Sequence, residues 1–143
     1  MSNTILDAAI ELLERDFSVI PVERLTKKPC IPWKEYQSRL PTEEELELWW
    51  DKYPDANVAI ITGKVSGLAV VDADSEIGID WMSNHCTKTT VYAKTGKGKH
   101  AYYLYPYHTD IKNAVRIAAD VDVSGEGGYV VAPPSIHANG TKY

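Results

Sequence analysis

Two aspartates, Asp72 and Asp74, end the apolar run LAVV (68–71) in a D-x-D spacing. Side chains two residues apart on a β-strand point to the same face, about 6.6 Å apart along the strand. Two carboxylates placed in this way can converge on one or two divalent cations. They also repel one another and need cations or hydrogen bonds nearby at neutral pH. The alternative for this pair alone is two turn aspartates that cap a helix beginning at Ser75.

Asp122, within the run AADVDVSGEGG, is the third metal-binding candidate. Its alternation with the valines at 121 and 123 points its side chain to one face of a strand whose other face is apolar. Asp120 points the same way, one step earlier, and is either the wrong choice or an accessory. The alternative is a solvent-facing strand aspartate with no ligand.

A glycine-containing turn, GKGK (96–99), precedes His100 and offers phosphate-binding chemistry. Glycines let backbone amides approach a ligand, and His100 beside Lys97 and Lys99 can hold a triphosphate through charge-assisted hydrogen bonds. The spacing is not that of a Walker A loop. The alternative is a solvated hairpin with lysines on its outer face and a packed histidine.

The sequence gives little support for a zinc site, for secretion or for insertion into a membrane. Cys30 is far in sequence from the His85-Cys86 pair, and no ligand pair has finger-like spacing, so we expect no zinc. Two cysteines do not make a secreted disulfide framework. The N-terminal residues have no basic region of a secretory signal, and no apolar run approaches the ~18 residues of a membrane span. These features predict a cytoplasmic protein with no membrane partner.

The hydrophobic patterning predicts an α+β domain with a central sheet, in which the helices lie mainly in the N-terminal part of the chain. Gly96–Lys99 predicts a β-hairpin turn and Gly125–Gly127 a second one. Residues 24–40, which include Trp33, read as an ordered loop. We expect helices over 4–15, from Thr42 onward and over 75–83, and strands over 17–22, 57–61, 67–74, 89–95, 100–106, 121–124 and 128–134.

Length and composition fit one domain over residues 1–143. Apolar residues make up 44% of the chain and charged residues 24%, near the average for folded domains. The net charge is −5, which argues against a broad nucleic-acid-binding face. The segment 88–116 nevertheless holds six basic residues and one acid, whereas residues 1–87 hold eight and sixteen. This distribution is compatible with a local phosphate site.

Four segments follow one another along the chain: KKPCIPWK (27–34), IITGKVSGLAVVDAD (60–74), TGKGKH (95–100) and VDVSGEGGYVVAPPSIHANG (121–140). This series resembles the bifunctional primase-polymerase (prim-pol) family of the archaeo-eukaryotic primase superfamily. The similarity covers nearly the whole chain. The closing segment is its most specific part and D-A-D its least.

The resemblance implies a catalytic core with an RRM-like central sheet and a packed N-terminal helical unit. It implies that two divalent cations, Mg²⁺ or Mn²⁺, bind to the three carboxylates. It also implies a nucleotide-binding set formed by His100, Lys97, Lys99 and Ser135. Two positions depart from the family pattern, and both concern the nucleotide rather than the metal. Gly98 stands where a serine is common, and Ser124 stands where an arginine is common.

The implied activity is that of a DNA primase and DNA polymerase. It would transfer a nucleotide from an NTP or dNTP onto a 3′-hydroxyl on a single-stranded DNA template, in the replication of a plasmid, phage or mobile element. We expect the chain to be the N-terminal part of a longer replication protein, cut at its C-terminal edge, with a helicase domain or subunit as partner. The alternatives are a catalytically weak or inactive prim-pol-like domain that binds single-stranded DNA or recruits a helicase, and a metal-dependent phosphohydrolase or nuclease.

Overall fold

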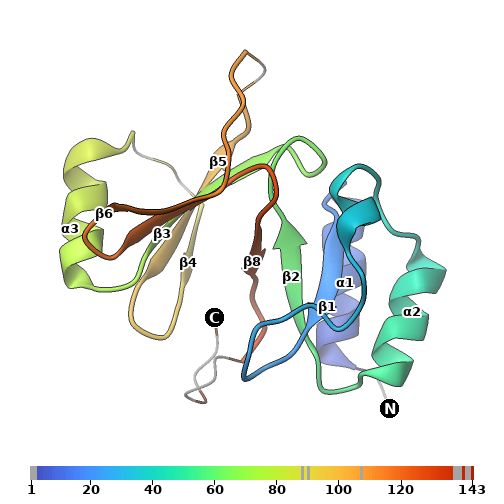
Figure 1. Cartoon of the computed structure of the whole chain (residues 1–143). Helices are drawn as coiled ribbons and strands as arrows, with labels where there is room; N and C mark the ends of the chain where they lie inside the picture. The colour runs from blue at the N-terminus through green and yellow to red at the C-terminus, as the bar shows by residue number, and fades with distance from the viewer. Residues whose placement is uncertain (1–2, 88, 90, 107, 137–139, 141–142) are drawn as a thin grey trace.

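The computed structural model describes residues 3–87, 89, 91–106, 108–136, 140 and 143. Figure 1 shows a mixed α/β molecule with one sheet on each side, so the predicted α+β class is confirmed. The elements are α1 (Thr4–Glu14), β1 (Val19–Val22), the 3₁₀ helix η1 (Lys34–Gln37), α2 (Glu43–Lys52), β2 (Asn57–Ile61), β3 (Leu68–Ala73), α3 (Glu76–His85), β4 (Tyr92–Lys94), β5 (Lys99–Leu104), β6 (Ala114–Ala118), β7 (Val121–Ser124) and β8 (Tyr129–Val131).

The strands form two antiparallel sheets in place of the one central sheet that the pattern predicts. The smaller sheet has the order β1-β2-β8 and the larger one the order β4-β5-β3-β7-β6. The predicted hairpin over 89–106 is present, because β4 pairs with β5. The strand β6 lies in a segment for which the patterning predicts no element.

The predicted hairpin around Gly125–Gly127 is wrong. The strand β7 pairs with β3 and β6, whereas β8 pairs with β2 in the other sheet. The intervening residues cross from one sheet to the other and form two hydrogen bonds with Thr62. The Thr62 hydroxyl donates to the Gly125 carbonyl (2.6 Å), and the Thr62 N–H donates to the Gly128 carbonyl (3.0 Å). A glycine-rich turn therefore bends the chain but does not decide which strand it pairs with.

The main core lies between the two sheets and the two N-terminal helices. Leu68 and Val70 face inward from β3 and belong to the same buried cluster as Val58 and Ile60 of β2. Trp50 of α2 is 2% exposed in this cluster. Because successive side chains alternate across a strand, the next residue of β3 on this face is Asp72. The apolar packing of β3 therefore places a carboxylate at the edge of the core.

The other faces of the two sheets are also covered. Met82 of α3 packs against Ala73 and Ala101 of the larger sheet. The segment before α2 covers the smaller sheet, where Tyr36 of η1 is 6% exposed and packs with Ile20. The expectation of an ordered loop over 24–40 is thus confirmed, with η1 as one ordered turn within it.

Local capping signals set where the helices begin. The Asn3 side chain accepts hydrogen bonds from the N–H groups at the start of α1, and Thr42 forms a capping box with Glu45 before α2. Ser75 accepts from the Gly78 N–H at the start of α3. In the part of the chain that the structure describes, no helix combines the length and apolar character needed to cross a bilayer.

Glu45 is also the centre of a small polar network that ties η1 to α2. It accepts hydrogen bonds from the Arg39 guanidinium, the Tyr36 hydroxyl and the Thr42 N–H. The Arg39 contact is the largest cause that lowers the pKa of Glu45 to about 2. Because the folded-state pKa is depressed, Glu45 contributes stability above its unfolded pKa of about 4.5, and this contribution is lost as the pH falls toward 2.

We expect Glu45→Gln to lower the free energy of unfolding by about 1–2 kcal/mol at pH 7. The difference from the parent should shrink at pH 3, because the parent loses the same contribution there. Urea unfolding at both pH values measures it, with Glu47→Gln on the same helix as control. An equal loss at both pH values would contradict the network's role.

Candidate active site

The pairing of β3 brings the predicted site residues together. Asp72 lies directly opposite His100 of β5 on one side and Asp122 of β7 on the other. Residues directly opposite one another on neighbouring strands share a face and place their side chains in contact range. The row His100–Asp72–Asp122 is therefore built by three adjacent strands, with Asp74 at the end of β3.

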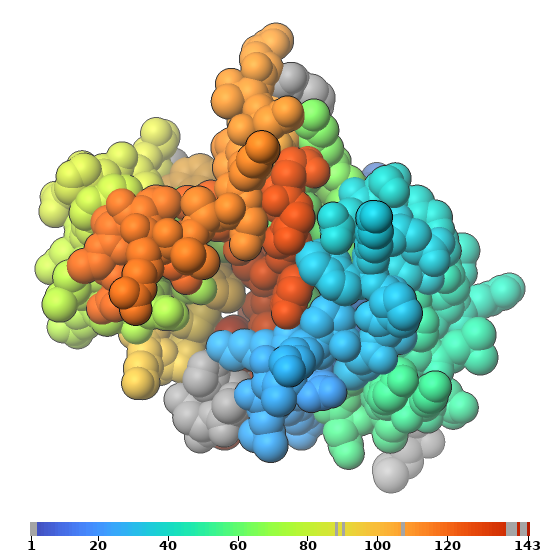
Figure 2. Space-filling view, viewed as in Figure 1, coloured from blue at the N-terminus to red at the C-terminus, as the bar shows by residue number. Residues whose placement is uncertain are grey.

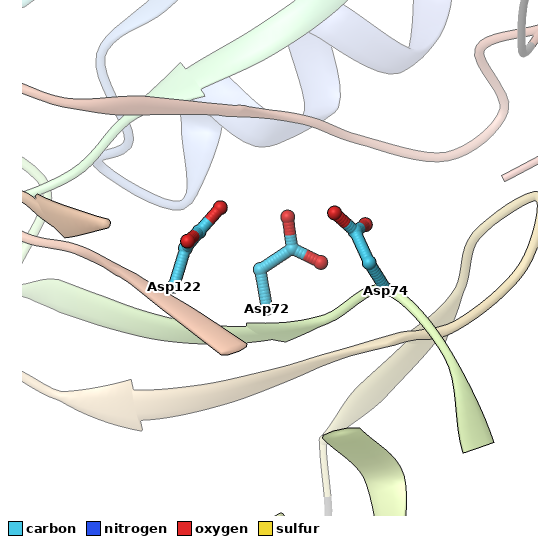
Figure 3. A group of neighbouring side chains, drawn as sticks. All are labelled: Asp72, Asp74 and Asp122. Carbon is cyan, nitrogen blue, oxygen red and sulfur yellow. The ribbon is translucent and has the colours of Figure 1, made fainter. Parts of the chain in front are cut away.

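The three carboxylates converge. Each of Asp72, Asp74 and Asp122 offers an oxygen within 4.8 Å of the other two, and Figure 3 shows all three side chains projecting from the sheet into the same space. Partial burial, followed by repulsion from Asp72 and Asp122, raises the pKa of Asp74. An all-carboxylate donor set suits hard divalent cations such as Mg²⁺ and Mn²⁺.

Asp72 has a buried oxygen that suits a cation ligand. Among the described residues, no hydrogen-bond donor satisfies its Oδ1 atom. The nearest nitrogen is Nε2 of His100, 3.4 Å away, and His100 is 5% exposed. A buried carboxylate oxygen without a donor is costly, and a bound cation would remove that cost.

Asp122 is held by an irregularity in its neighbouring strand. The register between β6 and β7 shifts between Ala114 and Ala118, and within this bulge Arg116 adopts a left-handed conformation (φ 52°). The bulge aims the Arg116 N–H at Asp122 Oδ1, with a donor–acceptor distance of 2.7 Å. A backbone amide therefore orients the third carboxylate.

Asp120 does not join the carboxylate group. It occupies the turn before β7, where its carboxylate accepts a hydrogen bond from the Ser75 hydroxyl (2.7 Å) and its carbonyl accepts one from the Asp74 N–H (2.9 Å). Asp122, the third acid named from the sequence, is therefore the one that lies in the cluster. Asp120 is an accessory that anchors the end of β3.

Gly98 lies against the same end of β3. A Cβ atom at this position would lie 1.6 Å from the Ala73 carbonyl oxygen and 3.0 Å from the Asp74 Cα. The turn approaches β3 too closely for any side chain at this position. The close approach helps to fix the backbone that carries Asp74.

A cleft of about 790 Å³ opens beside the carboxylates. Asp72, Asp74 and His100 line it from the larger sheet, and Tyr129 and Val131 line it from β8 of the smaller one. Figure 2 shows the surface hollowed between the orange strands of the larger sheet and the red strand β8 of the smaller one, beside the blue segment that follows β1. The site is therefore a junction between the two sheets.

The structure separates the other predicted nucleotide contacts. Lys97 lines the cleft. Lys99 lies on the opposite face of β5 from His100, with its Nζ 3.8 Å from the centroid of the Tyr92 ring, so it is not brought to the carboxylates. Ser135 is fully buried and its hydroxyl exchanges two hydrogen bonds with the Val58 backbone. It therefore has no free hydroxyl for a nucleotide and instead joins the C-terminal segment to β2.

The groups at the site to which the sequence analysis assigned no role include the Lys27 side chain and Asn113, which line the cleft, and the Arg116 amide. Lys27 belongs to the first of the four segments compared with the family, so a signal for it was present. A bulge amide has no sequence signal, because it depends on how two strands pair.

The family profile of the bifunctional DNA primase/polymerase N-terminal domain, Prim-Pol, matches residues 9–143. The chain belongs to the Prim-Pol family. This confirms the resemblance carried by the four segments and implies a nucleotidyltransferase-type enzyme whose substrates are nucleotides and nucleic acid. Among curated proteins, the chain has no match.

If the carboxylates of this Prim-Pol domain bind a cation, neutralising one of them has two opposite effects. We expect Asp74→Asn to raise the free energy of unfolding without metal by about 1 kcal/mol, because it removes repulsion among three close carboxylates. The same change should abolish most of the stabilisation produced by added Mn²⁺. Thermal unfolding with and without Mn²⁺ measures both effects. The exposed Asp80→Asn on α3 is the control, and equal stabilisation of both variants by Mn²⁺ would contradict a metal site.

A second expectation concerns the close approach of Gly98. Gly98→Ala should destabilise the domain by about 2 kcal/mol or more, because the Ala73–Asp74 backbone must move. It should also weaken Mn²⁺ binding. Gly67→Ala is the matched control, since Gly67 has a left-handed φ of +68° but open space around it and should cost about 1 kcal/mol. Denaturant unfolding and Mn²⁺ titration of both variants test this, and equal effects would argue against the contact.

Proposed function

We propose that this Prim-Pol domain is a DNA primase and DNA polymerase. It transfers a nucleotide from an NTP or dNTP onto a 3′-hydroxyl held on a single-stranded DNA template. The observation that carries the proposal is the convergence of Asp72, Asp74 and Asp122 beside a cleft, in a chain whose family acts in DNA priming and polymerisation.

Asp72, Asp74 and Asp122 would hold two divalent cations, Mg²⁺ or Mn²⁺. Their clustered oxygens and the unsatisfied Asp72 Oδ1 fit that role. When bound, such cations lower the pKa of an attacking hydroxyl and offset charge on the phosphates. The Arg116 amide keeps Asp122 oriented, and the Asp120–Ser75 pair keeps the end of β3 in place.

His100 and Lys97 are the proposed triphosphate contacts on the larger sheet. His100 stands beside Asp72, so a group that it touches also lies close to the carboxylates. Lys97 reaches the same cleft from the turn before β5 and supplies a positive charge. Positioning and electrostatics, rather than a covalent step, do most of the catalysis in phosphoryl-type transfer, and this arrangement suits them.

The net charge of −5 predicts weak binding of the template by this domain alone. A helicase domain or subunit would supply the stronger hold, in the replication of a plasmid, phage or mobile element. The helicase partner and the mobile-element context are expected from the family resemblance.

The test is primer extension and de novo synthesis on single-stranded DNA with NTPs or dNTPs and Mg²⁺ or Mn²⁺. We expect product from the parent chain and from Asp80→Ala. Asp72→Ala and His100→Ala should reduce the rate by at least about 100-fold, because each removes a group that acts at the transferred phosphate.

Two outcomes would overturn the proposal in favour of an alternative. Binding of metal, nucleotide and single-stranded DNA without any product would indicate the binding or helicase-recruiting role. Cleavage of DNA, or hydrolysis of nucleotides without polymer formation, would indicate a phosphohydrolase or nuclease that uses the same carboxylates on water.

A further inference from the structure

Lys27 lines the cleft from outside the sheet that carries the carboxylates. It lies in the loop between β1 and η1, the blue segment beside the hollow in Figure 2. Its side chain is exposed, so the charge is available to a ligand. The cleft therefore has a cation on each side, with Lys97 presented by the larger sheet and Lys27 by the loop attached to the smaller one.

The backbone at Lys27 is held in a defined position. Its N–H donates to the Glu23 carbonyl (2.9 Å), and its carbonyl accepts a hydrogen bond from the Tyr129 hydroxyl (2.7 Å). Lys27 itself has a left-handed φ of 61°, an uncommon conformation for a residue with a side chain. The Trp33 ring packs edge-on against Tyr129 with centroids 5.2 Å apart. Two segments distant in sequence, 27–34 and 121–140, thus meet to present one lysine.

The negative charge in the cleft requires further positively charged side chains such as Lys27. Three carboxylates and an ionised triphosphate carry more negative charge than two divalent cations neutralise, so further cations are needed in the walls. Lys27 lines the same cleft as Asp72 and Asp74. A ligand phosphate bound near Asp74 would therefore also lie within the field of Lys27.

We propose that Lys27 is a second cationic contact for the triphosphate of the incoming nucleotide, placed across the cleft from Lys97 so that the nucleotide is held between the two sheets. The inference rests on the proposed function. It gives Lys27 a binding role on the side of the cleft that faces the carboxylates and His100. Lys28, the next residue, is also exposed but is not among the residues that line the cleft. It provides a matched control of equal charge.

The experiment measures the dissociation constants of dGTP and dGMP in the presence of saturating Mn²⁺ and without DNA, so that no catalysis is involved. We expect Lys27→Gln to weaken dGTP binding about tenfold and dGMP binding by less than about twofold, because the lost contact is to the outer phosphates. Lys28→Gln should leave both constants within about twofold of the parent. Lys27→Arg should restore most of the dGTP affinity.

Mn²⁺ binding without nucleotide separates a phosphate contact from damage to the site. Lys27→Gln should bind Mn²⁺ at least as tightly as the parent, because a positive charge near the carboxylates is removed. Weaker Mn²⁺ binding, unchanged dGTP binding, or an equal loss for dGTP and dGMP would each overturn the inference. A parent chain that binds Mn²⁺ but no dGTP would instead overturn the proposed function, and the role of Lys27 with it.

Discussion

The position of β3 between β5 and β7 is the constraint on which the rest of the structure depends. One face of β3 carries Leu68 and Val70 into the core between the sheets, and Asp72 follows at the same spacing. A shift of one residue would turn the apolar side chains out of that core and Asp72 toward α3. Hydrophobic packing therefore fixes the register, and the register fixes where the carboxylates lie.

The site combines a rigid sheet with a junction that can admit a ligand. The larger sheet supplies the carboxylates and His100, whereas β8 and the Lys27 loop supply the other side of the cleft. Thr62 and Tyr129 connect the parts through hydrogen bonds between residues far apart in sequence. The clustered carboxylates repel one another, so the site is held against its own electrostatics by the packing around β3.

Much of the site was predictable because its signals are local. The period of two along a strand placed Asp72 and Asp74 on one face. The same alternation puts Lys99 and His100 on opposite faces of β5, although both were expected at the triphosphate. The hairpin around Gly125–Gly127 was not predictable, because a glycine turn specifies a bend but not a pairing partner. The edge strand β6 was missed, since its side chains are partly or fully exposed and show no buried alternation.

The sequence by itself determined the strand alternation, the helix caps and the order of motifs that identifies the family, since each depends on residues close together in the chain or on their succession. Only the tertiary structure decided that Asp122 rather than Asp120 joins the cluster, that Ser135 is buried and that Lys27 reaches the cleft. These outcomes depend on pairings and packing between segments far apart in sequence. Such contacts form only when two sheets share one core, so no local pattern encodes them.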